Sequence, residues 1–453
     1  MFTRRFRRTV TLLSASALSF GIATSGVLIS NADASPSTPG VSAKTITIGA
    51  AVPLSGIAVS YANVSASANA VFKYIDKKGG INGRTIKYLR LDDCYGLAAY
   101  GLGCTAGAST TTLSVNQVLV AQDHVFATVG SLGTAAEESV LSYLKANKVP
   151  QLFVASGSIG WDQPAKYPNL FGYQPSYVME GKIFARYIKT NDAALSVGYI
   201  GQNDDFGADG YIGLTDGGVK IATADNLSYN AADAITGSTS DITADVSQLQ
   251  TDKVQVVVLD SVPGFTNGIL ETAHALGYAP KWIISSVGAD PTSVSTTIPL
   301  EDGATTLDYF PASNSNANPW IPWLRKVLEA DPADFPGFSA SSVISGNELY
   351  GAGYAVAFAE TLKAEGRTVT RAGFVKTLES TTLSTPAITP LRYTGGNHQG
   401  LLGGAIAVIL ANGTSAPQYA VPTKTIFTTT NAANSPLSVV AKPVVQQIPK
   451  WLK

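Results

Sequence analysis

Residues 125–156, VFATVGSLGTAAEESVLSYLKANKVPQLFVAS, contain a complete strand–helix–strand unit. The run VFATVG (125–130) is short and apolar, and VPQLFVAS (149–156) resembles it, so both are expected to be buried strands. The intervening TAAEESVLSYLKANK (134–148) is expected to be a helix. Two strands joined through a helix are typical of a parallel sheet that is covered by helices.

The same alternation continues toward the N-terminus. We expect strands at 45–52 and 84–93, and helices at 61–80 and 105–122. In 61–80 the apolar residues recur at helical spacing and a Gly pair ends the pattern. These elements predict one doubly wound α/β unit.

A second unit of similar kind starts after residues 169–177. Helices and strands are expected to alternate in it, at 178–191, 194–201, 206–217, 219–224, 240–252, 254–260, 264–278 and 281–286. The last third then contributes helices at 319–332, 346–366 and 371–380 and strand-like runs at 387–393 and 403–413. These pieces are too few for a third unit, so we expect them to complete the first two.

The predicted fold class is therefore α/β, with two doubly wound parallel-sheet lobes and a chain that crosses between them more than once. We assign residues 44–172 and 303–388 to lobe 1, and residues 173–302 and 389–453 to lobe 2. A length of 453 residues favours two cores over one.

The amino-acid composition disfavours some classes of function. Hydrophobic residues make up 45% of the chain and charged residues 14%, which indicates a globular protein with large cores. Lys and Arg total 31 against 32 Asp and Glu, and no basic block lies beyond the N-terminus, so we expect no nucleic-acid partner.

The N-terminus predicts export. Residues 1–34 have a basic start, an apolar stretch rich in small residues and an ADA cleavage pattern, so we interpret them as a signal peptide. Residues 35–43 follow as a polar linker with two prolines. The alternative is a membrane-anchoring helix over 10–29, which its many Ser, Thr and Gly residues disfavour. We therefore expect an exported, periplasmic or extracellular protein.

Two cysteines, Cys94 and Cys104, are the only ones in the chain. In an exported protein such a pair is expected to form a disulfide. Two cysteines without a nearby His do not complete a tetrahedral zinc site, so we expect no metal there. The sequence also has no phosphate-loop, dinucleotide or cation-site motif, so we expect no cofactor.

Three predicted strands end in similar Gly- and Ser-rich turns, at 51–61, 129–136 and 154–160. In an open parallel sheet, ligands bind beyond the carboxyl ends of the strands. Small residues let a ligand approach the backbone, and the N–H groups of a helix start favour an anion, so these turns predict a cradle for a carboxylate. The alternative is that the Ser and Thr residues only cap helices.

The order of these motifs resembles that of a known family. ITIGAAVPLSGIAVSYANVSASANAVFKYIDKKGGINGRTIKYLRLDD (46–93) is similar to the opening of the type I periplasmic solute-binding proteins of the branched-chain amino acid group, with its P-L-[ST]-G turn and GGINGR segment. The likeness continues through 125–156, SVGYIGQNDDFGADG (196–210), 239–260 and 349–366. It covers the chain from about Lys44 to about Thr414.

The resemblance implies two lobes that are joined by a multi-strand hinge and close over a ligand. It implies a first-lobe site in which Tyr61 packs on the ligand and two segments grip its α-carboxylate. The residues of these segments are Ser131, Thr134 and Ala135, followed by Ala155, Ser156, Gly157 and Ser158.

The second lobe matches the family less well. Phe206 corresponds to an aromatic residue that closes over the ligand. Ser261 falls near another closing aromatic, which this chain lacks, and Val287 falls near the acid that holds the ammonium group in amino acid binders. The nearest acids here are Asp260 and Asp290, so the chain departs from the family at this point.

The expected function is that of a monomeric solute-binding protein that serves an ABC importer. It would clamp a small organic solute, such as an amino acid, an amide or a related carboxylate, and pass it to a membrane permease without catalysis. A ligand-sensing receptor is one alternative. A secreted α/β hydrolase is less favoured, because the chain has no G-x-S-x-G motif after a strand.

Overall fold

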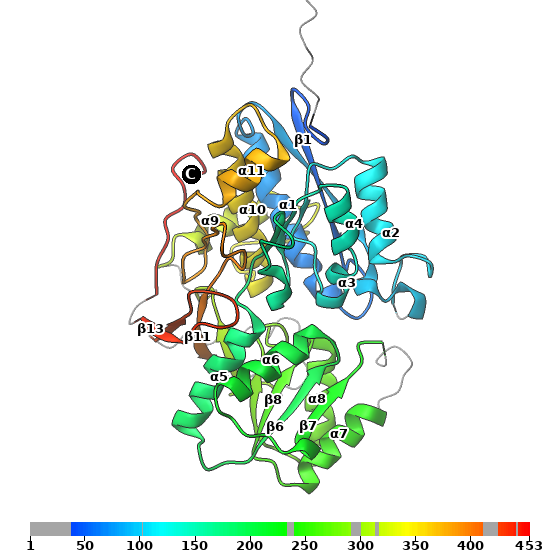
Figure 1. Ribbon diagram of the computed structural model, residues 1–453, viewed down its shortest axis with the longest axis vertical. Coiled ribbons are helices and arrows are strands. Elements are labelled where there is room, and N and C mark those ends of the chain that lie inside the picture. The colour runs from blue at the N-terminus through cyan, green and yellow to red at the C-terminus, as the bar shows by residue number, and fades with distance from the viewer. Residues whose placement is uncertain are drawn as a thin grey trace, which may run out of the picture. The chain divides into compact units, whose positions relative to one another are not determined.

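The computed structural model describes residues 38–101, 103–232, 240–290, 300–312, 317–410, 425–440 and 443–453 (Figure 1). The predicted signal peptide, and residues 35–37 of the predicted linker, lie outside the described residues. Among the described residues, no helix has the length and apolar character that crossing a bilayer requires.

The first sheet has five parallel strands in the order β2-β1-β3-β4-β5. Its strands are β1 (Thr45–Val52), β2 (Thr85–Asp92), β3 (Thr128–Val129), β4 (Gln151–Val154) and β5 (Leu170–Gly172). The connecting helices are α1 (Ala62–Lys77), α2 (Thr112–Gln117), α3 (Thr134–Glu138) and α4 (Leu141–Ala146). Alternate residues of β1 pack on α1 and on α2, so helices cover both faces of the sheet.

The second sheet has eight strands in the order β13-β12-β11-β10-β9-β8-β6-β7. Its strands are β6 (Val197–Gln202), β7 (Asn226–Tyr229), β8 (Val256–Asp260), β9 (Lys281–Ile284), β10 (Thr305–Asp308), β11 (Gly403–Val408), β12 (Ile426–Thr428) and β13 (Ser438–Val440). Neighbouring strands among β6, β7, β8, β9 and β10 pair in parallel. The pairs β10–β11, β11–β12 and β12–β13 are antiparallel.

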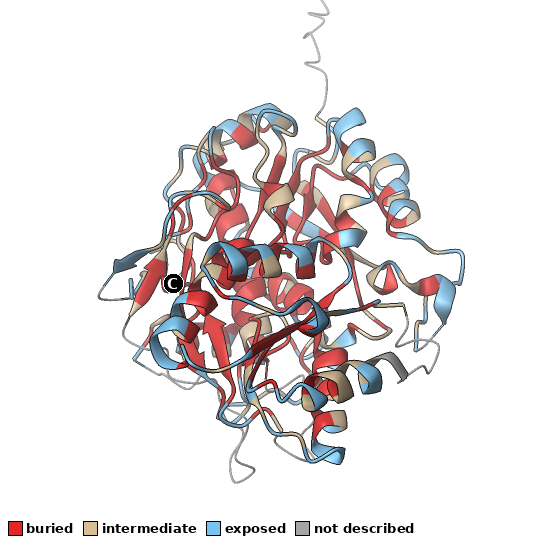
Figure 2. Cartoon of the chain, turned by 60° about the horizontal axis from the view of Figure 1, so that its bottom comes forward, coloured by how far each residue is buried: buried red, intermediate tan, exposed pale blue. Residues whose placement is uncertain are grey.

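Helices also cover both faces of the second sheet. They are α5 (Tyr177–Asn191), α6 (Asp205–Asp216), α7 (Ser240–Thr251) and α8 (Pro263–Ala275). Val256 and Val258 of β8 pack with α5 and α6, whereas Val257 and Leu259 pack with α7 and α8. This alternation buries both sides of the strand, as the buried colour of the strands in Figure 2 shows.

The remaining helices return to the first sheet. They are α9 (Trp320–Glu329), α10 (Gly346–Glu365) and α11 (Arg371–Leu378). Helix α10 lies against α1 at Gly351, where an added Cβ would meet the carbonyl oxygen of Val64 at 1.9 Å. Near the C-terminus, the backbone oxygen of Gln446 accepts a hydrogen bond from Trp320 Nε1 of α9 at 2.9 Å.

We call the first sheet with α1–α4 and α9–α11 the first lobe, and the second sheet with α5–α8 the second lobe. The predicted fold class, two doubly wound α/β lobes, is confirmed. The predicted division of the chain between the lobes stays a prediction. Strand β10, which that division gives to lobe 1, lies in the second sheet.

Two predicted strands are wrong. Residues 219–224 are not a strand, because Val219 and Ile221 pack into the core beside α5 and the strand that pairs with β6 is 226–229. Residues 387–393 form only two isolated bridges, both at Leu391, since Pro390 cannot donate a ladder hydrogen bond. The predicted helix 134–148 is two helices, α3 and α4.

Candidate ligand-binding site

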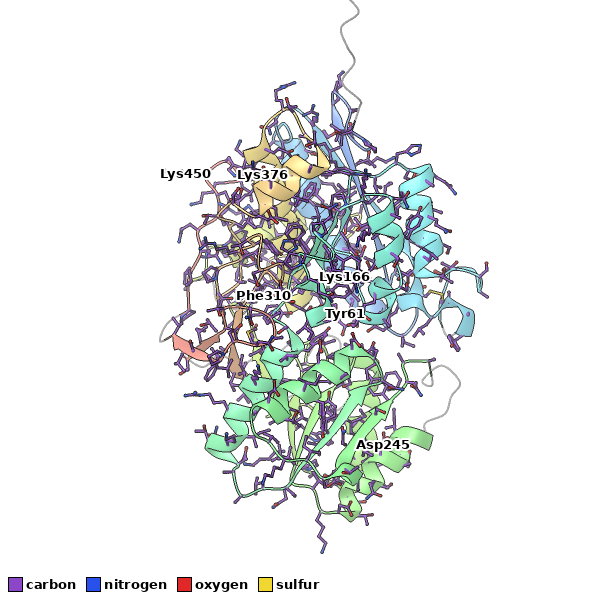
Figure 3. The ribbon with its side chains drawn as sticks, in the orientation of Figure 1. Tyr61, Lys166, Asp245, Phe310, Lys376 and Lys450 are labelled. Atoms are coloured by element: carbon purple, nitrogen blue, oxygen red, sulfur yellow. A yellow bond between two sulfur atoms is a disulfide. The ribbon has the colours of Figure 1, made fainter. Side chains whose placement is uncertain are left out.

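A cavity of about 70 Å³, measured as the space open to the centre of a water molecule, lies between the carboxyl ends of the two sheets. Figure 3 labels two of its lining residues, Tyr61 at the start of α1 and Phe310 just after β10. The residues that line it come from both lobes: Tyr61, Val64, Tyr95, Leu132, Gly133, Thr134, Ala155, Gln174, Tyr177, Ser286, Val287, Ala289, Asp290, Thr306, Leu307, Asp308, Tyr309, Phe310, Gly346, Asn347 and Tyr350.

Four of the predicted binding residues line this cavity: Tyr61, Thr134, Ala155 and Val287. Tyr61 precedes the first residue of α1, and its hydroxyl donates a 2.8 Å hydrogen bond to the backbone oxygen of Val287. Burial raises the pKa of Tyr61 well above its ordinary value, so the hydroxyl keeps its proton and remains a donor. This bond joins the first lobe to the second across the site.

The predicted serines lie behind the cavity wall. Ser131 Oγ accepts from the backbone N–H of Ala51 at 3.2 Å, and Ser156 Oγ is 2.8 Å from Thr134 Oγ1. Ser158 Oγ donates to Glu138 Oε1 at 3.2 Å. These hydroxyls therefore tie the turns after β3 and β4 to neighbouring groups of the first lobe.

The other predicted residues also lie off the cavity wall. Ala135 is exposed on α3, and Gly157 is buried next to Tyr177. Phe206 packs on Tyr177 with ring centroids 4.5 Å apart, and Ser261 Oγ is 2.7 Å from Thr266 Oγ1. The binding roles of all the predicted residues stay predictions.

The second lobe contributes carboxyl groups to the cavity wall. Asp308 ends β10, and its Oδ1 accepts the backbone N–H of Phe310 at 2.8 Å. Burial raises the pKa of Asp308 to about 7, with a further contribution from Asp290. Asp290, which the sequence indicated as one of the two nearest acids, is buried and lines the cavity.

Two more buried acids lie behind this wall. Glu180 on α5 accepts the backbone N–H of Ser286 at 2.7 Å, and burial raises its pKa to about 8. Asp260, the second acid indicated by the sequence, does not line the cavity. Its carboxylate accepts a hydrogen bond from Tyr199 Oη at 2.8 Å. Burial raises the pKa of Asp260 to about 7. Among the described residues that line the cavity there is no Lys, Arg or His.

Most lining residues were missed by sequence reasoning. They include five aromatic residues and three polar ones: Tyr95, Tyr177, Tyr309, Phe310, Tyr350, Gln174, Thr306 and Asp308. The sequence DYFP at 308–311 offered a signal, because an acid and two aromatic residues follow a β-branched run. Recognition of β10 as a strand would have placed this segment at the edge of the sheet where ligands bind.

The predicted disulfide is present and lies next to the cavity. Cys94 and Cys104 are joined, with their Cα atoms 5.8 Å apart. The next residue, Tyr95, has a left-handed backbone with φ of 60° and lines the cavity. The disulfide therefore restrains the loop that presents Tyr95.

Further hydrogen bonds connect the lobes beside the cavity. Gln202 Nε2 of β6 donates to Tyr95 Oη at 3.3 Å. The backbone N–H of Ile159 donates to Asp209 Oδ2 of α6 at 2.9 Å. Together with the bond from Tyr61 to Val287, these contacts hold the two lobes against each other.

Comparison with known proteins gives a family and a fold. A family model described as periplasmic binding protein matches residues 45–414. No curated protein sequence matches the chain. Among solved structures, a possible leucine/isoleucine/valine-binding protein from Rhodopirellula baltica SH 1 is 20% identical, with a TM-score of 0.69, over 85% of this chain and 98% of that one.

Two further solved structures are similar in fold. A branched-chain amino acid ABC transporter protein from Thermus thermophilus, with bound valine, is 16% identical, with a TM-score of 0.66, over 83% of this chain and 96% of that one. A fatty acid ABC transporter substrate-binding protein from Thermomonospora curvata is 15% identical, with a TM-score of 0.67, over 92% of this chain and 95% of that one. The solutes named for these two proteins, a fatty acid and valine, differ in chemistry.

Proposed function

Because this chain belongs to the periplasmic binding protein family of the leucine/isoleucine/valine-binding type, we propose that it is the extracytoplasmic solute-binding protein of an ABC importer. It binds a small organic solute between its lobes, and the closed form is recognised by a membrane permease. Binding of the solute shifts the equilibrium from the open toward the closed arrangement, and no chemical step is needed.

The observation that supports this proposal best is the cavity itself. Residues from the ends of both sheets line it, and hydrogen bonds between the lobes cross beside it. A solute held there contacts both lobes at once, so its binding energy favours the closed arrangement over the open one. Export through the predicted signal peptide and a monomeric state belong to the same proposal.

Native mass spectrometry of the freshly purified protein tests the proposal directly. We expect a co-purified small molecule that is released when the protein is unfolded. In a thermal-shift assay the released molecule should stabilise the emptied protein, by about 2.7 kcal/mol at 100 times its dissociation constant. Steady turnover of the solute into a different molecule would contradict the proposal.

A further inference from the structure

We propose that the solute carries a positively charged amine and no carboxylate, and that Asp308 is the residue that selects it. This inference rests on the proposed function, because it concerns the same cavity. It differs from the amino acid ligand that the family resemblance suggests.

The charge of the cavity wall is the first argument. Asp290 and Asp308 line the cavity from the second lobe, and no basic side chain is among its described lining residues. The carboxyl of Asp308 accepts its hydrogen bond from the backbone N–H of Phe310 and not from a cation, and a buried carboxylate in that position either takes up a proton or recruits a cation. Burial accordingly raises the pKa of Asp308, and a bound ammonium group would supply a compensating positive charge.

A hydroxyl on the same strand is the second and independent argument. Thr306 lies two residues before Asp308, so both side chains lie on one face of β10. Thr306 is fully buried and lines the cavity, and its Oγ1 has no hydrogen-bond partner among the described residues. An ammonium group has three N–H donors, which suit a carboxylate and a hydroxyl oxygen on one face.

Aromatic rings provide the third argument. The rings of Tyr309 and Phe310 have centroids 4.8 Å apart, and those of Phe310 and Tyr350 are 6.1 Å apart. All three residues line the cavity, as do Tyr61 and Tyr177. The face of an aromatic ring attracts a cation and disfavours an anion, so this wall suits an alkylammonium group.

Two of the first-lobe hydroxyls that were predicted to bind a carboxylate do not reach the cavity. The hydroxyls of Ser131 and Ser156 are hydrogen-bonded within that lobe, and neither residue lines the cavity. The cavity is also small.

A thermal-shift screen with four matched panels tests the charge of the solute. The panels are primary amines, neutral amides, carboxylates and amino acids, each of up to about nine non-hydrogen atoms. Isobutylamine, isobutyramide, isovalerate and valine serve as a set of similar shape. We expect the largest stabilisation in the amine panel at pH 8. A strongest hit in any other panel would overturn this inference and leave the proposed function intact, whereas no hit in any panel would count against both.

Variants of one carboxyl group test the role of Asp308. Asp308→Asn removes the charge at nearly constant volume, and it should weaken the best amine at least tenfold. Asp302→Asn, at an exposed position six residues earlier, is the matched control and should bind as the wild type does. The melting temperature of each empty variant shows that it is folded. A folded Asp308→Asn protein that keeps the wild-type affinity for the amine would overturn the assignment.

Discussion

Single side chains decide how the two lobes meet at the cavity, and Tyr61 is the clearest case. Its hydroxyl is the donor to the Val287 backbone oxygen, and its ring lines the cavity. The same side chain therefore touches the solute space and fastens the first lobe to the second. A change at its hydroxyl alters closure without removing the ring.

Tyr61→Phe tests this role. A hydrogen bond of this kind contributes about 1 kcal/mol, so we expect the solute to bind about fivefold more weakly. Isothermal titration with the solute measures the effect. Tyr100→Phe is the control, since Tyr100 is 54% exposed and does not line the cavity. Equal affinities for wild type and Tyr61→Phe would mean that this bond does not stabilise the closed form.

Because the pKa of Asp308 is raised, amine binding is expected to depend on pH. Burial raises its pKa to about 7, and Asp290 is the charged neighbour that adds to the shift. The carboxyl is therefore protonated below about pH 7, and an ammonium group prefers the ionised form, so binding releases a proton. We expect the ratio of wild-type to Asp308→Asn affinity for the amine to rise between pH 5 and 7, by at most roughly tenfold per pH unit, and to level off above. Titration of both proteins across this range measures the ratio, since other groups such as Glu138 affect both proteins alike. A ratio that falls as pH rises would contradict the prediction.

At the scale of elements, the loop between β2 and α2 shows how a local constraint serves the site. The disulfide closes a short loop, with a sequence separation of 10 between its cysteines. Tyr95 follows Cys94 directly and accepts from Gln202 of the second lobe. Without the disulfide, this loop would have more freedom and would present Tyr95 less often.

Replacement of both cysteines by serine should therefore have two effects. The free energy of unfolding should fall by roughly 2–3 kcal/mol, since the disulfide no longer restrains the unfolded chain. Solute affinity should fall as well, because ordering Tyr95 then costs part of the binding energy. Denaturant unfolding and calorimetric titration measure the two effects, and reduction of the wild-type protein should reproduce them. A lower free energy of unfolding with unchanged solute affinity would show that the disulfide does not contribute to solute binding.

Helix α3 of the first lobe meets the start of α6 of the second lobe, and acidic residues lie on both sides. Glu138 is half-buried there, and burial, followed by the charge of Asp205, raises its pKa from 4.5 to about 8. Asp204 adds to this shift, whereas the hydrogen bond from Ser158 opposes it. When the lobes separate, this burial is lost and the pKa returns toward its ordinary value.

Closure should accordingly weaken as pH rises. The closed arrangement favours protonated Glu138, so its advantage is complete below about pH 4.5 and is lost as pH rises toward 8. Small-angle scattering of the solute-free protein should show a larger radius of gyration at pH 8.5 than at pH 6. Glu138→Gln should reduce this difference, and Glu329→Gln, at an exposed position on α9, should not. A pH-independent radius in the wild type would refute this account.

At the scale of the whole molecule, the two-lobed α/β architecture could be predicted from the sequence. Helical and strand periodicities are local properties, and long elements such as α1 and α10 fill many turns of a regular pattern. Strand β10 could not be recognised in this way. It has four residues, and it pairs with Ile283 and Ile284 of β9 on one side and with β11, about a hundred residues later, on the other.

The site was predictable to a smaller extent for the same reason. The turns after β1, β3 and β4 were placed correctly at the carboxyl edge of a sheet, and Tyr61, Thr134 and Ala155 do line the cavity. The sequence could not reveal which hydroxyls bond to each other, as Thr134 and Ser156 do. The position of Asp308, Tyr309 and Phe310 at the cavity could not be predicted, because it depends on the long-range pairing of β10.

The return of α10 to α1, and the addition of β10–β13 to the second sheet, also govern how the protein is made. A ribosome that has released the first 300 residues has produced β1–β9 but neither the helix that covers α1 nor the last four strands. Neither lobe can therefore complete its native fold before synthesis of the chain is almost finished.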